Sequence, residues 1–302
     1  MKEASFIEYI RSRSVFDPGV VPVGPGDDMA VVRWGGQDLL VAADQVLDGV
    51  HFRLGEHGAR AAGRKAMARN LSDVAAMACV PLAAVATVAL PRGFSEADAR
   101  EMYAGLRELG DAFSCPLVGG DVGSWDGPLA ISLTILATTG PGGVVLRAGA
   151  RVGDAICVTG SFGGAWKTTR HLTFTPRVAE GLVLARYGLH SMIDVSDGLA
   201  IDLGHVCDAS GVGADVQAAS VPIHPDALNR PDALGAALGD GEDYELLLTL
   251  PQDQASRLIA EKPLGDVPVT RIGTIVAGAA RSLVLADGRR QELPARGWQH
   301  ET

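Results

Sequence analysis

Apolar and polar residues follow two different spacings along the chain. Between residues 129 and 138, Ile131 and Leu133 alternate with polar neighbours, which predicts a strand with one buried face. Ser95 begins the sequence Ser-Glu-Ala-Asp, a capping signal that predicts a helix to about residue 113. Further strands are expected over residues 29–34, 38–43, 83–90, 117–121, 155–159, 191–195, 215–218, 245–250, 267–275 and 282–285. Further helices are expected over residues 5–12, 59–79, 176–187, 198–209 and 253–261.

Strands and helices are mixed throughout the chain, which indicates an α/β (α+β) protein. With 302 residues, the chain is long enough for two domains or for one large α/β unit. A glycine-rich turn at residues 141–143 interrupts the pattern, and we place the domain boundary just after it. The predicted domains therefore cover residues 1–143 and 144–302.

Composition narrows the classes of partner. The sequence has 26 Lys and Arg against 36 Asp and Glu, a net charge of −10, which argues against binding to nucleic acid or to an anionic membrane. The four cysteines lie far apart in apolar segments, so we expect free thiols and a reducing compartment. The most apolar stretch is interrupted by Pro81, and the first residues lack an apolar leader. We therefore expect a soluble, cytoplasmic protein.

Two adjacent carboxylates, Asp27 and Asp28, follow the turn Gly24-Pro25-Gly26. They form either a solvated turn or a site for a cation, because ionised neighbours repel unless something screens them. Similar acidic groups recur beside glycine, serine or asparagine at the edges of predicted elements, in Asp44, Asn70–Asp73, Gly119–Asp121, Asp194–Asp197 and Gly241–Asp243. Several single carboxylates suit Mg²⁺ together with phosphate oxygens, so the pattern predicts a site for Mg²⁺ and a nucleoside triphosphate.

Two other kinds of site have little support in the sequence. The seven histidines show no spacing typical of a zinc site. The chain also lacks the Gly-x-Ser-x-Gly sequence that presents a nucleophilic serine. The functional interpretation therefore depends on the carboxylates.

Taken in order, the acidic motifs resemble those of one known family. They are Gly26-Asp27-Asp28, Asp44 with Asp48–Phe52, Asn70–Met77, Gly119-Gly120-Asp121, Arg147–Ala150, Ile193–Leu199 and Gly241–Leu246. The chain resembles the thiamine-monophosphate kinases, within the ATP-binding superfamily that includes aminoimidazole ribonucleotide synthetase and selenophosphate synthetase. The resemblance runs nearly from end to end.

The resemblance implies ATP-dependent phosphorylation of thiamine monophosphate to thiamine diphosphate by direct in-line transfer. It also implies a two-domain synthetase-like fold, with an N-terminal mixed-sheet domain that forms a homodimer and a C-terminal α/β domain. By position, the ligands of several Mg²⁺ ions are Asp28, Asp44, Asp73, Asp121, Asp194 and Asp197. The implied ATP contacts are Tyr103, Gly120, Asp121, Arg147 and Ser196. The implied thiamine monophosphate contacts are His51, Glu242 and Trp298.

Several of these assignments have a structural alternative. Trp298 offers a π-face to a cationic thiazolium, but it could instead cap the core. His51 could bond to the backbone of its own loop, and Arg147 could be a surface ion-pair partner. Within the acidic pair, we expect Asp28 to bind metal and Asp27 to shape the turn.

The sequence departs from the family's pattern at four places. Ala42-Ala43 precede the metal-binding acid where Ser-Thr is usual, Val122 stands in place of Thr, and Ala78 stands where Gly is typical. The stretch over residues 160–177 is shorter than usual. Ala42-Ala43 and the shortened stretch motivate one alternative, a catalytically weak paralogue that binds nucleotide and regulates a partner. A second alternative is a superfamily relative that acts on another acceptor.

Overall fold

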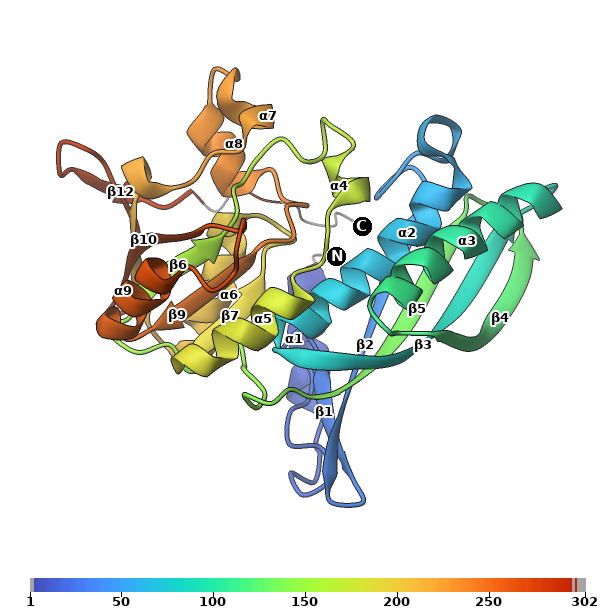
Figure 1. Ribbon diagram of the computed structural model, residues 1–302, viewed down its shortest axis with the longest axis horizontal. Coiled ribbons are helices and arrows are strands. Elements are labelled where there is room, and N and C mark those ends of the chain that lie inside the picture. Colours follow the sequence, from blue (N-terminus) through green and yellow to red (C-terminus); the bar gives the residue numbers. More distant parts are fainter. Residues whose placement is uncertain (1–2, 295–296, 298–302) are drawn as a thin grey trace.

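The computed structural model describes residues 3–294 and 297, and its strands form two sheets (Figure 1). The first sheet has the strand order β1-β2-β5-β3-β4. All neighbours are antiparallel except β3 and β4, which are parallel, so the sheet is mixed. Its strands are β1 (Ala30–Trp34), β2 (Gln37–Leu47), β3 (Cys79–Pro91), β4 (Leu117–Trp125) and β5 (Ala130–Thr139).

The second sheet has the order β12-β11-β8-β10-β6-β9-β7 and belongs to the second half of the chain. Its strands are β6 (Ala155–Thr159), β7 (Ser191–Asp194), β8 (Gly213–Gln217), β9 (Leu246–Leu250), β10 (Val269–Val276), β11 (Arg281–Val284) and β12 (Arg290–Glu292). The helices of this half are α4 (Arg170–Thr173), α5 (Val178–Leu184), α6 (Leu199–Ser210), α7 (Pro225–Leu228), α8 (Ala233–Gly239) and α9 (Gln252–Glu261), with short 3₁₀ turns over Ala185–Tyr187 and Ala218–Ser220.

Alternation along β5 produces one buried face of the first sheet. Ile131, Leu133 and Ile135 are fully buried, while the residues between them are partly exposed. The helices α2 (Leu54–Ala76) and α3 (Glu96–Ala112) cover this buried face (Figure 1). The predicted cap is confirmed, because the Ser95 side chain accepts a hydrogen bond from the backbone N–H of Asp98 at 3.0 Å.

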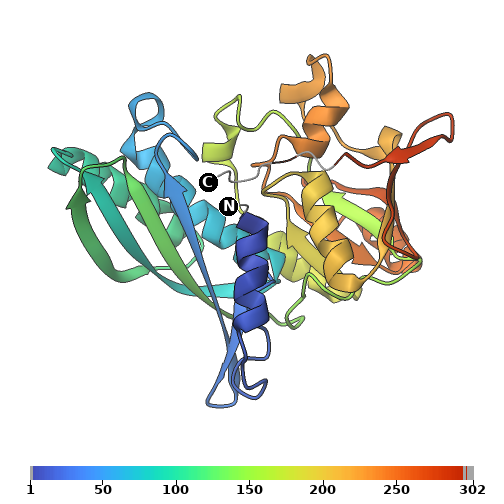
Figure 2. The same cartoon turned by 180° about the vertical axis from the view of Figure 1, so that it is seen from behind.

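Helix α2 lies between the two halves and positions much of the site (Figure 1). It contacts α3, β2 and β5 on one side and α4, α5 and β7 on the other. Most of its residues from Ala59 to Ala76 are buried, as expected for a helix packed all round. Gly58 interrupts the helix with φ of 77°, a conformation that glycine adopts at little cost. Seen from behind, α1 (Glu3–Arg13) stands in front of the junction between the halves (Figure 2).

The mixed α/β class is confirmed, and so are most of the predicted elements. Several boundaries were wrong: α2 begins at Leu54, β2 continues to Leu47, and two further differences concern residues singled out in the sequence. Helix α2 ends at Ala76, and the strand β3 begins at Cys79, so Pro81 lies inside a strand instead of ending a helix. Strand β4 was expected to end at Gly119-Gly120-Asp121, but it continues through these residues to Trp125. In the described part of the chain, no helix has both the length and the apolar character needed to span a membrane.

Candidate active site

A pocket of about 210 Å³ lies where the two halves of the chain meet. Five carboxylates line it, and four of them come from separate parts of the chain: Asp28 just before β1, Asp44 in β2, Asp73 in α2 and Asp194 at the end of β7. The other lining residues are Asp27, Ala42, Ala43, Arg69, Arg147, Ser196 and Tyr244. The structure thus brings together six of the residues that the sequence proposed for metal and ATP, namely Asp28, Asp44, Asp73, Asp194, Arg147 and Ser196.

Arg147 connects the acidic turn to the second half of the chain. Its guanidinium donates to Oδ1 of Asp28 at 2.5 Å. Its backbone N–H donates to both carboxylate oxygens of Asp27, at 3.1 and 3.2 Å. Asp27 also accepts the backbone N–H of Asp28, so it joins two segments as well as shaping the turn. Arg147 is therefore an ion-pair partner inside the pocket, not on the open surface.

The electrostatics of the pocket fit a divalent cation. Burial raises the pKa of Asp28, Asp73 and Asp194, and the charges of neighbouring carboxylates raise it further. The Oδ2 atom of Asp28 is buried and accepts no hydrogen bond from the residues that the structure describes. A set of converging carboxylate oxygens is the donor type that Mg²⁺ prefers, and a bound cation would favour their ionised forms.

Neighbouring side chains orient two of these carboxylates. Ser72 donates a hydrogen bond of 2.5 Å to Oδ2 of Asp194, which brings a residue of α2 against the end of β7. The Nε atom of Arg69 lies 3.2 Å from Oδ2 of Asp44. The guanidinium also donates to the carbonyl oxygen of Gln45 at 3.2 Å. Arg69 is thus a partly buried cation in the pocket, beside Asp44.

A buried ionic cluster lies on the same helix, around Lys65. Its ammonium group donates to the carbonyl oxygen of His51 at 2.6 Å and pairs with the carboxylate of Glu242. It also lies 2.8 Å from Nδ1 of His171 and 5.4 Å from the ring centroid of Trp166. Burial lowers the pKa of Lys65 to about 8. Burial alone would raise the pKa of Glu242, but His171 and Lys65 lower it to about 2, so both partners are charged at neutral pH.

The ring of His51 makes the backbone contact that the structural alternative expected. Its Nδ1 accepts the backbone N–H of Leu47 at 3.1 Å, and the residue is buried. The cluster around Lys65 nevertheless brings His51 close to Glu242, from the opposite half of the chain. These two predicted substrate residues therefore both contact Lys65, which precedes Arg69 by one turn of α2.

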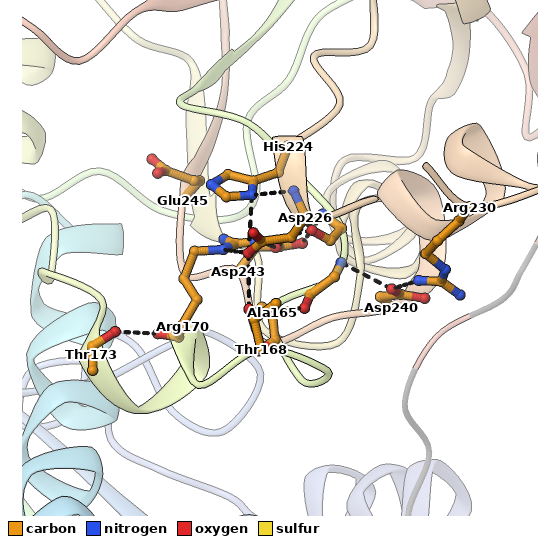
Figure 3. A network of polar contacts seen from close by, with 12 residues as sticks. Ala165, Thr168, Arg170, Thr173, His224, Asp226, Arg230, Asp240, Asp243 and Glu245 are labelled. Carbon is orange, nitrogen blue, oxygen red and sulfur yellow. Dashed lines mark hydrogen bonds and ion pairs between the residues drawn. The ribbon is translucent and has the colours of Figure 1, made fainter. Parts of the chain in front are cut away.

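The loop that carries Glu242 and Tyr244 is held by a polar network (Figure 3). Arg170 donates to Asp243 at 2.9 Å and lies 3.2 Å from Asp226. Asp240 accepts the backbone N–H of Gly164 at 3.0 Å and pairs with Arg230. The segment before α4 and the loop after α8 are thereby joined into one support for the pocket wall.

Other predicted residues lie outside the pocket. Gly120 and Asp121 lie on the exposed strand β4, where a Cβ atom on Gly120 would come within 1.8 Å of the carbonyl oxygen of Ala86. Tyr103 is 48% exposed on α3. Asp197 follows the strand β7 and groups with Asp202 and His205 instead. Trp298 lies outside the described residues.

Sequence reasoning missed three residues around the pocket. Lys65 and Arg69 precede Asp73 by eight and four positions on α2, so helical spacing could have placed them on its face. Tyr244 belongs to the quoted motif Gly241–Leu246, where only Glu242 was assigned. Nothing in the local sequence shows that its side chain enters the pocket.

Comparisons with known proteins agree with this arrangement. Residues 26–139 match the family model for the N-terminal domain of AIR synthase related proteins. A thiamine-monophosphate kinase of Rhodopirellula baltica is 38% identical over 99% of this chain and 97% of its own. The solved structure of AaThiL complexed with AMPPCP and TMP has a TM-score of 0.84 at 26% identity, over 99% of this chain and 97% of its own.

A second solved structure, a thiamine-monophosphate kinase from Stenotrophomonas maltophilia, has a TM-score of 0.76 at 35% identity. It covers 96% of this chain and 98% of its own. The likeness therefore includes both halves of the chain. The chain belongs to the thiamine-monophosphate kinases, a family of phosphotransferases.

Proposed function

We propose that this chain transfers the γ-phosphoryl group of ATP to thiamine monophosphate, forming ADP and thiamine diphosphate. The observation that carries the proposal is the pocket of five carboxylates with Arg147 at the junction of the halves. Phosphoryl transfer depends on positioning and on neutralising charge more than on covalent catalysis, and this pocket offers both. The relatives named above support the choice of acceptor.

Magnesium ions fit four of the pocket carboxylates, Asp28, Asp44, Asp73 and Asp194. When bound, Mg²⁺ would supply neutralisation of the negative charge on the phosphates. We propose Asp121 and Asp197 as further ligands, as the family resemblance implies. The pocket walls at Ala42 and Ala43 carry no hydroxyl groups, so metal ligation here depends on carboxylates and backbone oxygens.

The chain's own polar groups would position the two substrates. Arg147 offers a planar fork for phosphate oxygens and lies with Ser196 in the pocket wall, so we assign both to ATP. Gly120 and Tyr103 remain proposed ATP contacts. His51, Glu242 and Trp298 are proposed for thiamine monophosphate, and the closeness of His51 to Glu242 supports this choice.

We also propose a homodimer of two-domain subunits, with domains 1–143 and 144–302. Strand β4 is an exposed sheet edge, and Val118 and Val122 on it are 64% and 68% exposed. An exposed apolar edge of this kind is usually covered in the native protein. All four cysteines carry free, buried thiols, which supports a reducing compartment such as the cytoplasm.

The first test is a kinase assay with purified protein, ATP, Mg²⁺ and thiamine monophosphate. We expect thiamine diphosphate from the wild type, and a loss of turnover of about a hundredfold or more in both Asp28→Asn and Asp73→Asn. Asp287→Asn, which changes an exposed surface aspartate, is the matched control and should keep wild-type turnover. Circular dichroism would establish that each variant is folded.

A folded wild type that forms no thiamine diphosphate at saturating substrates would exclude the proposed activity. Tight binding of Mg-ATP without turnover would instead indicate the regulatory paralogue. Wild-type rates in Asp28→Asn or Asp73→Asn would remove that residue from the metal ligands.

A further inference from the structure

Tyr244 lines the pocket and has a buried hydroxyl group. The residue is 2% exposed, and its ring stacks on Phe174 with the ring centroids 4.1 Å apart. Its hydroxyl makes no hydrogen bond to any residue in the described ranges. Buried polar groups are rarely left unpaired, so a hydroxyl in this position calls for a ligand.

The backbone holds Tyr244 in an uncommon conformation. Its φ is 52°, and that of Glu242 is 62°. Both values lie in the left-handed region, which residues other than glycine rarely adopt. Hydrogen bonds maintain this geometry: Tyr244 N–H donates to the carbonyl oxygen of Val195 at 2.8 Å, and Glu242 N–H donates to that of Ser196 at 2.7 Å. Conformations of this cost are typical of ligand-binding segments.

Arg69 supplies a cation beside this hydroxyl. It lines the same pocket as Tyr244 and lies close to the carboxylate of Asp44. Its Nε–H is buried and makes no aligned hydrogen bond within the described residues, although Oδ2 of Asp44 lies 3.2 Å away. A guanidinium and a phenol donate hydrogen bonds without providing negative charge, which suits an anion.

The position of Arg69 along α2 indicates which anion it would bind. Lys65, Arg69 and Asp73 are spaced by four residues, so they follow one stripe of the helix at intervals of about 6 Å. Lys65 contacts His51 and Glu242, proposed for the organic part of the acceptor, and Asp73 is proposed for metal. Arg69 therefore stands between the organic end of the acceptor and the place where phosphoryl transfer occurs.

We infer that Arg69 and Tyr244 bind the phosphate monoester of the acceptor and thereby select a phosphorylated acceptor over the corresponding free alcohol. This inference rests on the proposed function. The contacts would be made to the oxygens that do not attack, while Arg147, the pocket's other arginine, is left for ATP.

The transfer step balances without a catalytic base. One oxygen of the acceptor phosphate forms a bond to the γ-phosphorus of ATP. The bond from that phosphorus to the oxygen bridging to the β-phosphate breaks, and ADP leaves with the electron pair. Because the second pKa of a phosphate monoester is about 6, its dianion is the main form at neutral pH and no proton has to be removed. Arg69 and Tyr244 would orient this dianion and offset its repulsion from ATP.

The test compares the binding of thiamine monophosphate and of thiamine, by calorimetry with Mg²⁺ and without ATP. We expect Tyr244→Phe to weaken binding of thiamine monophosphate about tenfold, as for one hydrogen bond to a charged group, and to leave thiamine binding unchanged. Arg69→Gln should weaken it further, and Arg69→Lys should recover part of the loss. Turnover should show a raised KM for the acceptor with an unchanged KM for ATP.

Tyr187→Phe is the matched control, because it removes a hydroxyl that bonds to Glu261 away from the pocket. It should bind both compounds as the wild type does. Unchanged binding of thiamine monophosphate in folded Tyr244→Phe, equal losses for thiamine, or a loss confined to ATP would overturn the inference. If Tyr244→Phe does not fold, the same binding measurements are made with Arg69→Lys, and the same results would overturn the inference. A wild type that prefers thiamine monophosphate over thiamine but does not phosphorylate it would refute the proposed function and leave this phosphate site supported.

Discussion

Lys65 is a fully buried lysine, which proteins accommodate only when the charge is matched. Its ammonium has three donors and three partners in the structure: the carboxylate of Glu242, the carbonyl oxygen of His51 and the ring of His171. Because Glu242 comes from the other half of the chain, this single residue connects the halves through charge as well as packing.

Replacing Lys65 by methionine should therefore destabilise the protein. Methionine fills a similar volume but leaves the Glu242 carboxylate buried and unmatched, so we expect a loss of about 3 kcal/mol in the free energy of unfolding. Urea denaturation measures this value. The double variant Lys65→Met/Glu242→Gln should recover part of it. Arg107→Met, which breaks an exposed ion pair with Asp111, should change stability very little. Equal effects of Lys65→Met and Arg107→Met would contradict this reading.

At the residue scale, sequence reasoning identified the acids but not their partners. Asp28, Asp44, Asp73 and Asp194 were predictable because a carboxylate beside a turn or among apolar residues needs a special reason. Arg69 gave no such signal, because arginine on a helix usually faces solvent. Its role depends on which segments the tertiary structure brings against α2.

At the scale of elements, strand β4 differs most from what its sequence suggested. Glycines usually end strands, yet Gly119 and Gly120 lie inside β4. At Gly120 the close approach to β3 leaves no room for a side chain. Pro81 similarly lies inside β3, beside a register shift in its pairing with β5. Strand pairing, which local sequence does not encode, decided both boundaries.

Charge placed on this edge should prevent dimer formation. Val122 is 68% exposed, and Val122→Lys would put an ammonium group into the proposed interface. We expect the wild type to have the mass of a dimer, and Val122→Lys that of a monomer, in size-exclusion chromatography with light scattering. Val152→Lys changes an equally open valine, 61% exposed and away from β4, and should remain dimeric. A monomeric wild type, or a dimeric Val122→Lys, would contradict the proposed interface.

At the scale of the whole molecule, the pocket is a shared product of the two halves. One hydrophobic cluster includes Ala75 from the first half and Leu248 from the second. The two halves of the chain therefore share a hydrophobic core as well as the pocket. The carboxylates gathered at this junction repel one another. Repulsion between the carboxylates of the binding site therefore lowers the stability of the folded protein.

Magnesium should stabilise the protein more at pH 8 than at pH 5.5. Burial, followed by the charge of Asp28, raises the pKa of Asp194 to about 7 from its ordinary value of 3.8. A raised pKa in the folded state gives stability at low pH that is lost as the pH rises through about 7. Mg²⁺ would offset this loss by pairing with the ionised carboxylates. The measurement is the increase in Tm on adding Mg²⁺ to EDTA-treated protein at both pH values. Equal increases, or an unreduced increase in Asp73→Asn, would contradict it.

The hydrogen bonds between Asp27 and the Arg147 backbone have a consequence for how the chain folds. They join residues 120 positions apart, so the intervening loop must close before the pocket exists. During synthesis, the pocket carboxylates of residues 27–73 leave the ribosome long before Arg147 and Asp194. The pocket is therefore completed late, and a nascent chain that ends before residue 147 carries an acidic turn without its cationic partner.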